Sequence, residues 1–205
     1  MAGTRPRHES RCAEIIEMAR DLLLGEGLDA FSMRTVAASA GMRLGNLQYY
    51  FATRDDLLEA VIRAEIANDL TVVEGSLRAE SAVRDVSELA RQLVENWSSG
   101  AGGVYLSLAS LAYHSDRFRA LNREVYESFY AAIGSLVRRI DPDAALPDVR
   151  TRAQLMTSLL DGAALQLHAA VHTKAESDAL IERAAALLVA IAADRQSSRS
   201  NPAVP

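Results

Sequence analysis

The apolar residues of this chain recur mostly at the three- and four-residue intervals of an α-helix. This pattern predicts a first helix over residues 9–24 and two short helices over 33–40 and 44–50. Ser32 is placed to cap the first short helix, because its hydroxyl can accept a backbone N–H of the first turn. Gly41 ends that helix at a point where the chain must turn with a positive φ.

Beyond residue 53 the pattern predicts only long helices. Thr53, with Asp56 three residues later, resembles a capping box, and it opens a helix that extends to about residue 79. Further helices are expected over 83–98, 103–114, 116–140, 147–172 and 176–194. Strand-like alternation is nowhere sustained, so the sequence predicts an all-α protein.

We expect the chain to divide into four segments. Residues 1–8 are polar and resemble a flexible basic arm, and residues 9–53 would form a three-helix head. Residues 54–195 would form a helical body. Residues 196–205 are rich in Ser, Pro and Asn and are expected to be a disordered tail.

Composition narrows the possible classes of protein. With 205 residues, 49% of them hydrophobic, the chain can bury a substantial core. A net charge of −5 argues against nucleic-acid binding over the whole surface, but it permits a local basic face. The lone Cys12 excludes an internal disulfide, and no apolar run reaches the roughly 18 residues of a membrane span. We therefore expect a cytoplasmic protein without a membrane segment or a cofactor.

The two short helices and the glycine between them suggest a helix-turn-helix unit that binds DNA. Residues 30–54 contain three arginines and no carboxylate, which suits a surface facing phosphates. In such a unit the second short helix lies in the major groove. Its outward residues could approach DNA closely, read base edges or donate to phosphates: Gly45, Asn46, Gln48, Tyr49 and Tyr50. Arg34 and Arg54 flank this helix, and Tyr50 could equally be a core residue.

The stretch FSMRTVAASAGMRLGNLQYYFATRDDLLEAVI resembles the N-terminal domain of the TetR family of bacterial transcriptional regulators. The matching positions within about residues 10–65 are Val36-Ala37, Ala40-Gly41-Met42, Gly45, Leu47, Tyr50-Phe51, Thr53 and Leu57. The resemblance implies DNA contacts by Arg34, Thr35, Arg43, Leu44, Gly45, Asn46, Gln48, Tyr49, Tyr50 and Arg54. Asn46, Gln48 and Arg54 replace the family's usual Thr, Tyr and Lys, and the first two should alter which operator is read.

The resemblance further implies a homodimer on a palindromic operator and a cavity in the body for a small-molecule effector. Segments 155–171 and 176–194 carry broad, alanine-rich apolar faces that suit a dimer, although packing within one chain could use the same faces. A partly apolar or aromatic effector would suit these candidates: Trp97, Tyr105, Tyr113, Phe118, Tyr126, Phe129, Tyr130, Asp161 and His168. Each aromatic could equally be a core residue, and Asp161 could lie on a solvated face.

The resulting prediction is a DNA-binding repressor that a small-molecule effector releases from its operator. The alternatives are a helical ligand-binding or scaffold protein that does not bind DNA, and a small all-α enzyme using His114 or Asp161. The run His114-Ser115-Asp116 has the residue types of a catalytic triad, but consecutive residues cannot line up as one, so we expect no enzyme. His168 and His172 have the spacing of a metal pair without a third ligand nearby, so we expect no metal.

Overall fold

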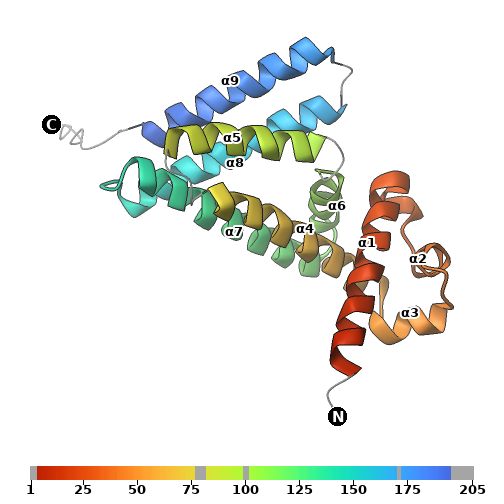
Figure 1. Ribbon diagram of the computed structural model, residues 1–205. Coiled ribbons are helices and arrows are strands. Elements are labelled where there is room, and N and C mark those ends of the chain that lie inside the picture. The colour runs from red at the N-terminus through yellow and green to blue at the C-terminus, as the bar shows by residue number, and fades with distance from the viewer. Residues whose placement is uncertain (1–3, 77–81, 99–101, 170–171, 195–205) are drawn as a thin grey trace. The chain divides into compact units, whose positions relative to one another are not determined.

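The computed structural model describes residues 4–76, 82–98, 102–169 and 172–194, and every regular element within these ranges is helical (Figure 1). The predicted all-α fold is confirmed, and each predicted helix is present with modest shifts at its ends. The predicted tail, 196–205, lies outside the described residues. The helices are α1 (Thr4–Ala30), α2 (Met33–Ser39), α3 (Leu44–Tyr50), α4 (Arg54–Ser76), α5 (Ala82–Asn96), α6 (Gly102–Ala112), α7 (Asp116–Ile140), α8 (Leu146–Ala169) and α9 (Lys174–Ala193).

Helix α1 starts earlier than the sequence pattern predicted. It begins at Thr4, so residues 4–8 are helical and do not form the flexible arm expected over 1–8. Pro6 is compatible with this position, because N–H groups in the first turn of a helix have no intrahelical acceptor. Gly27, with φ of 81°, interrupts α1 before its last residues, in agreement with the predicted glycine stop.

The chain forms two compact units, each made of two segments. The first comprises Met1–Asp69 and Asn96–Val125, and the second comprises Leu70–Glu95 and Tyr126–Pro205. The boundary predicted after residue 53 therefore does not coincide with the boundary between these units. One reason is that α6 packs against α1: a Cβ added at Gly103 would lie 3.3 Å from the side chain of Leu24.

In the first unit, α1, α2 and α3 lie together (Figure 1), and they enclose a small apolar core. The side chains at its centre are fully or almost fully buried: Ile15, Ala19, Val36, Ala37 and Leu47. Between α2 and α3 the chain turns at Gly41, where φ is +61°, and the Met42 N–H donates to the carbonyl of Ala37 at 2.9 Å. This is the predicted turn, and it fixes the direction in which α3 leaves α2.

In the second unit, α8 and α9 pack side by side (Figure 1). The guanidinium of Arg152, which is 4% exposed, lies at the centre of this packing. It donates to Asp141 at 3.1 Å and to the carbonyl of Ala192 at 3.2 Å, and it forms an ion pair with Asp148. Arg152 therefore ties α8 both to the end of α7 and to the end of α9.

Candidate nucleic-acid interface

Helix α2 begins with a reciprocal cap. The Thr35 N–H donates to the hydroxyl of Ser32 at 3.2 Å, and the Ser32 N–H donates to the hydroxyl of Thr35 at 2.9 Å. The Thr35 hydroxyl also lies 2.8 Å from the carbonyl of Ala30. Thr35 was expected to contact DNA, but its hydroxyl is engaged inside the protein and its side chain is only half-exposed.

Helix α3 has one buried face and one open face. Leu47 is fully buried, whereas Tyr49 is 76% exposed. Of the other residues predicted to contact DNA, Leu44 and Tyr50 are half-buried, and these are exposed: Arg34, Arg43, Gly45, Asn46 and Gln48. The open face borders a hollow of about 610 Å³ lined by Arg11, Gly41, Met42, Arg43, Asn46, Tyr49 and Tyr50.

This open face carries uncompensated positive charge. Residues 30–54 contain no Asp or Glu, and neither Arg34 nor Arg43 forms an ion pair within the part of the chain that the structure describes. Both guanidiniums are therefore available to an anionic partner. Because contacts to phosphate depend on the local charge, the net charge of −5 does not oppose such binding here.

Arg54, the third arginine of this stretch, is engaged inside the protein. Its Nε donates to the carbonyl of Phe31 at 2.8 Å, and its Nη2 donates to the carbonyl of Leu28 at 3.1 Å. Its guanidinium carbon also lies 5.7 Å from the centre of the Phe31 ring. Arg54 thus ties the first residue of α4 to the connection between α1 and α2, a role that the sequence did not predict.

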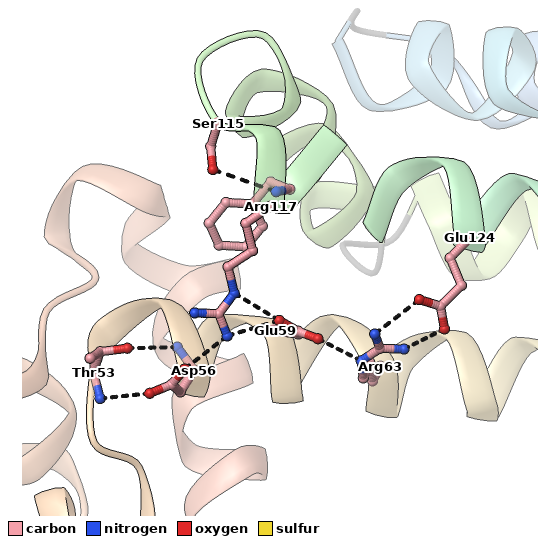
Figure 2. A network of polar contacts seen from close by, with 8 residues as sticks. Thr53, Asp56, Glu59, Arg63, Ser115, Arg117 and Glu124 are labelled. Atoms are coloured by element: carbon pink, nitrogen blue, oxygen red, sulfur yellow. Dashed lines mark hydrogen bonds and ion pairs between the residues drawn. The ribbon is translucent and has the colours of Figure 1, made fainter. Parts of the chain in front are cut away.

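The start of α4 is fixed by a second set of contacts, which Figure 2 shows. Thr53 and Asp56 form the predicted capping box, with N–H to side-chain distances of 3.0 and 3.1 Å. Arg117 of α7 donates to Asp56 at 2.8 Å and to Glu59 at 2.9 Å. Hydrogen bonds from Thr53 and Arg117 hold the pKa of the Asp56 carboxyl below its usual value. Helix α4 is thereby anchored where it follows α3.

Further along, α4 buries two carboxylates one turn apart. Glu65, 2% exposed, accepts from Arg20 of α1 at 2.5 and 3.3 Å. Asp69, fully buried, accepts from three neutral donors: Asn96 at 3.1 Å, the Trp97 indole at 2.7 Å and the Tyr105 hydroxyl at 2.6 Å. Burial raises the pKa of Asp69 against the effect of these hydrogen bonds.

We call Asp69, Trp97 and Tyr105 the Asp69 cluster. Asp69 was not among the residues predicted from the sequence, although the sequence carries one signal for it. Glu65 and Asp69 fall at the same helical spacing as the apolar residues Ile62 and Val73, that is, on the side of α4 that faces the core. An acid at such a position must be paired or hydrogen-bonded.

The residues predicted to line an effector cavity fall into two groups and several isolated positions. Trp97 and Tyr105 belong to the Asp69 cluster in the first unit. In the second unit, the Tyr126 hydroxyl donates to Asp161 at 3.0 Å and its ring stacks on Tyr130 at 5.8 Å. Asp161 is half-buried, and burial raises the pKa of its carboxyl.

The remaining candidates for the effector cavity lie either in the core or on the surface. Phe118 and Phe129 are core residues, 1% and 3% exposed, whereas Tyr113 is 81% exposed and His168 is also exposed. Because Tyr113 points into solvent, it does not line a cavity within this chain.

Residues that were considered for a catalytic triad or a metal site make structural contacts. The Ser115 hydroxyl accepts from the N–H of Phe118 at the start of α7, and Asp116 pairs with Arg119. His172 lies with its Nε2 3.2 Å from the carbonyl of Gln166. Within the described ranges, no three His, Cys, Asp or Glu side chains gather as a metal site would require, and no helix has the length and apolarity needed to cross a bilayer.

Comparison with protein families matches two parts of the chain. Residues 15–61 match the model of bacterial regulatory proteins of the tetR family, and residues 95–190 match the C-terminal model of the BetI-type transcriptional repressor. The first match covers the second half of α1, all of α2 and α3, and the start of α4. The second covers most of the remaining helices.

Individual proteins agree with these matches. The chain is 25% identical over 167 residues to the HTH-type transcriptional regulator PksA of Bacillus subtilis, covering 77% of this chain and 78% of that protein. Its fold is similar to that of a transcriptional regulator from Rhodococcus sp. Rha1, with a TM-score of 0.74, 21% identity and coverage of 88% and 94% of the two chains. It is also similar to a putative transcriptional regulator from Saccharomonospora viridis solved in complex with choline, with a TM-score of 0.72, 18% identity and coverage of 88% and 96%.

Proposed function

Because this chain belongs to the TetR family of bacterial transcriptional regulators, we propose that it represses transcription by placing α3 in the major groove of a palindromic operator. The observation that carries this proposal is the open face of α3, which is exposed, free of acids and flanked by Arg34 and Arg43, two arginines that pair with no carboxylate in the described ranges. Such a protein acts where the chromosome lies, in the cytoplasm.

The residues predicted to contact DNA differ in the part of the duplex that they would meet. Arg34 and Arg43, both exposed, would bind phosphates, and the amides of Asn46 and Gln48 would read base edges. Along the same face, Leu44, Gly45, Tyr49 and Tyr50 would pack against the duplex or donate to it. We assign Thr35 and Arg54 an indirect part, because their polar atoms already hold the protein's own backbone.

The test is a binding titration on a duplex selected from the source genome. Tyr49→Ala and Arg34→Ala should each weaken operator binding, and Arg34→Ala should also lower the salt dependence by about one phosphate contact. Tyr113→Ala and Arg123→Ala are matched controls, because both residues are exposed but lie outside α1 to α4. If Tyr49→Ala and Arg34→Ala both bind the operator as well as the parent does, the proposal that α3 contacts the operator is wrong.

We also propose a homodimer that forms through α8 and α9. Packing between these helices within one chain buries much of their predicted apolar faces, including Met156, Leu160 and Leu188. A second apolar surface remains exposed on them: Leu155, Leu165, Ala179, Ala186, Leu187 and Ala190. A surface of this kind on a soluble regulator suits a partner helix pair, and a two-fold axis suits a palindromic operator.

The dimer is tested by charge insertion. Leu155→Glu and Leu187→Glu should each shift the protein to monomers in sedimentation velocity, because a carboxylate would be buried without a partner. Leu106→Glu, on the exposed Leu106 of α6, should leave the dimer intact. Dimers that persist in both test variants would contradict this interface.

For release from the operator we propose that an effector acts on the head through α4. This helix holds α1 through Glu65, α6 through Asp69 and α7 through Asp56 and Glu59. A ligand that disturbs the Asp69 cluster would therefore displace a helix that is separated from the end of α3 by only three residues. To change the ratio of the released form to the DNA-binding form tenfold, the ligand must favour the released form by about 1.4 kcal/mol.

The choline bound in the Saccharomonospora viridis protein suggests a first compound to try. Cations of this type are bound by aromatic faces together with a carboxylate, and both the Asp69 cluster and the group Tyr126, Tyr130 and Asp161 offer these groups. Operator complexes should dissociate when choline is added, and Tyr105→Phe or Tyr126→Phe should change the concentration required. Indifference of the complex to choline and to other small amines would reject a cationic effector.

A further inference from the structure

The imidazole of His8, on α1, lies against both tyrosines of α3. Its ring centre is 4.9 Å from that of Tyr50, with the planes inclined by 33°, and 5.9 Å from that of Tyr49, with the planes at 74°. The two tyrosine rings are 5.3 Å apart and almost perpendicular, at 88°. All three distances fall within the range of interacting aromatic pairs. His8, Tyr49 and Tyr50 therefore form one three-ring cluster across two helices.

The end of α1 that carries His8 is attached to the rest of the head. The sulfur of Cys12, one turn further along α1, lies 3.6 Å from Nδ1 of His8. Arg11 donates to the carbonyl of Ala40, at 3.5 Å, in the turn between α2 and α3. His8 is thus presented to α3 from a helical backbone that contacts the helix-turn-helix at a second point.

We infer that His8 is a positioning residue of the DNA-reading surface and acts through Tyr49 and Tyr50. The Tyr49 side chain is 76% exposed, so without a neighbour it would exchange among staggered rotamers. The His8 ring removes some of these orientations before DNA arrives. Less conformational entropy is then lost on binding, which favours the complex.

This inference rests on the proposed function, since it assumes that α3 binds DNA. The two can nevertheless fail separately. If the parent binds no duplex selected from the source genome, the proposed function fails. If the parent binds and changes at His8 have no effect, only the inference about His8 fails.

The experiment compares His8→Ala, which removes the ring, with His8→Phe, which keeps a ring but cannot donate to phosphate. Ser10→Ala is the matched control, because Ser10 is exposed on the same turn of α1 and is not part of the three-ring cluster. For each protein, affinity is measured on the operator and on an unrelated duplex over a range of salt concentrations. In DNA-free protein, nuclear Overhauser contacts between the rings of His8 and Tyr50 provide a second measurement.

We expect His8→Ala to bind the operator about threefold to tenfold more weakly, the value of one aromatic pair. Its affinity for unrelated DNA and its salt dependence should match those of the parent, and His8→Phe and Ser10→Ala should bind like the parent. Equal loss in His8→Ala and His8→Phe would overturn the inference, and a shallower salt dependence would then assign His8 to a phosphate. Parent-like binding by His8→Ala, or the absence of ring contacts in DNA-free protein, would also overturn it.

Discussion

Arg63 on α4 and Glu124 on α7 are joined by two parallel hydrogen bonds, 2.6 and 3.0 Å long (Figure 2). Arg63 also donates to Glu59 at 2.9 Å, and Glu59 in turn accepts from Arg117 of α7. The four side chains form a continuous series of ion pairs between the two helices. They hold the first part of α7 along the first turns of α4, directly after α3.

The Arg63–Glu124 pair should contribute modestly to stability and should depend on salt and pH. Both side chains are largely exposed, so a double-mutant cycle with Arg63→Ala and Glu124→Ala should give a coupling of about 0.2–1 kcal/mol. Hydrogen bonding from Arg63 lowers the pKa of Glu124. The coupling is therefore present above the unfolded-state pKa of about 4.3 and is lost as the pH falls through the lower folded-state value.

Urea unfolding of the four proteins, at neutral pH and near pH 3, measures this coupling, and added salt should reduce it. A coupling energy that is the same at both pH values would show that the pair is not an ionic one in solution.

Arg54 and Arg34 should behave differently when each is replaced by alanine. Arg54→Ala removes two hydrogen bonds from a charged donor, so we expect a loss of roughly 2 kcal/mol in the free energy of unfolding. Arg34→Ala should leave the thermal midpoint unchanged and weaken only operator binding. Thermal melts and DNA titrations of both variants make the comparison. An Arg54→Ala protein that melts like the parent and yet loses DNA would restore the phosphate contact predicted from the sequence.

The two glycines of the helix-turn-helix should also respond differently to alanine. Gly41 has a φ of +61°, so Gly41→Ala should destabilise the head by about 1–2 kcal/mol even though a Cβ there would meet no other atom. Gly45 is helical and open, so Gly45→Ala should fold at least as well as the parent. Its methyl group would lie on the face proposed to meet DNA, and operator binding should fall about tenfold or more.

Circular dichroism melts and operator titrations of the two variants separate these effects. Full operator affinity in Gly45→Ala would mean that the backbone of α3 does not approach the duplex closely.

Asp69→Ala should destabilise the first unit by about 1–3 kcal/mol, because the Trp97 and Tyr105 donors lose this acceptor. Asp69→Asn keeps an acceptor and removes the charge. Burial raises the pKa of Asp69 in the folded protein, so the stability linked to its protonation is full below the unfolded-state value of about 3.9. That stability is lost as the pH rises through the folded-state pKa.

The parent should therefore lose stability relative to Asp69→Asn as the pH rises from about 4 towards neutrality. Free energies of unfolding for the two proteins across this range provide the measurement. A difference that stays constant, or that changes in the opposite direction, is incompatible with a buried carboxylate whose pKa is raised.

Features set by residues close together in sequence could be predicted. The Thr53–Asp56 capping box and the turn at Gly41 depend on groups within one helical turn, and both are confirmed. The exposure of Tyr49 was also predicted, from its outward position on the second short helix, although its contact with DNA remains a prediction.

Features that join distant segments could not be predicted. Nothing near Arg54 indicates that its guanidinium reaches the carbonyls of Leu28 and Phe31, because those contacts require the folded connection between α1 and α2. The partners of Asp69 lie 27 to 36 residues away. The early start of α1 was missed because polar residues carry no hydrophobic periodicity, and the contacts of His8 were missed with it.

The composition of the first compact unit determines how the DNA-binding part of this chain could be transferred to another protein. Asn96–Val125 belongs to the same unit as the reading helix, and α6 within that segment packs on α1. A piece cut after residue 53 would leave α1 without α6, and a piece cut after Asp69 would also leave Asp69 without its three donors. A transplantable version would have to carry both stretches of chain, bridged by a designed linker in place of residues 70–95.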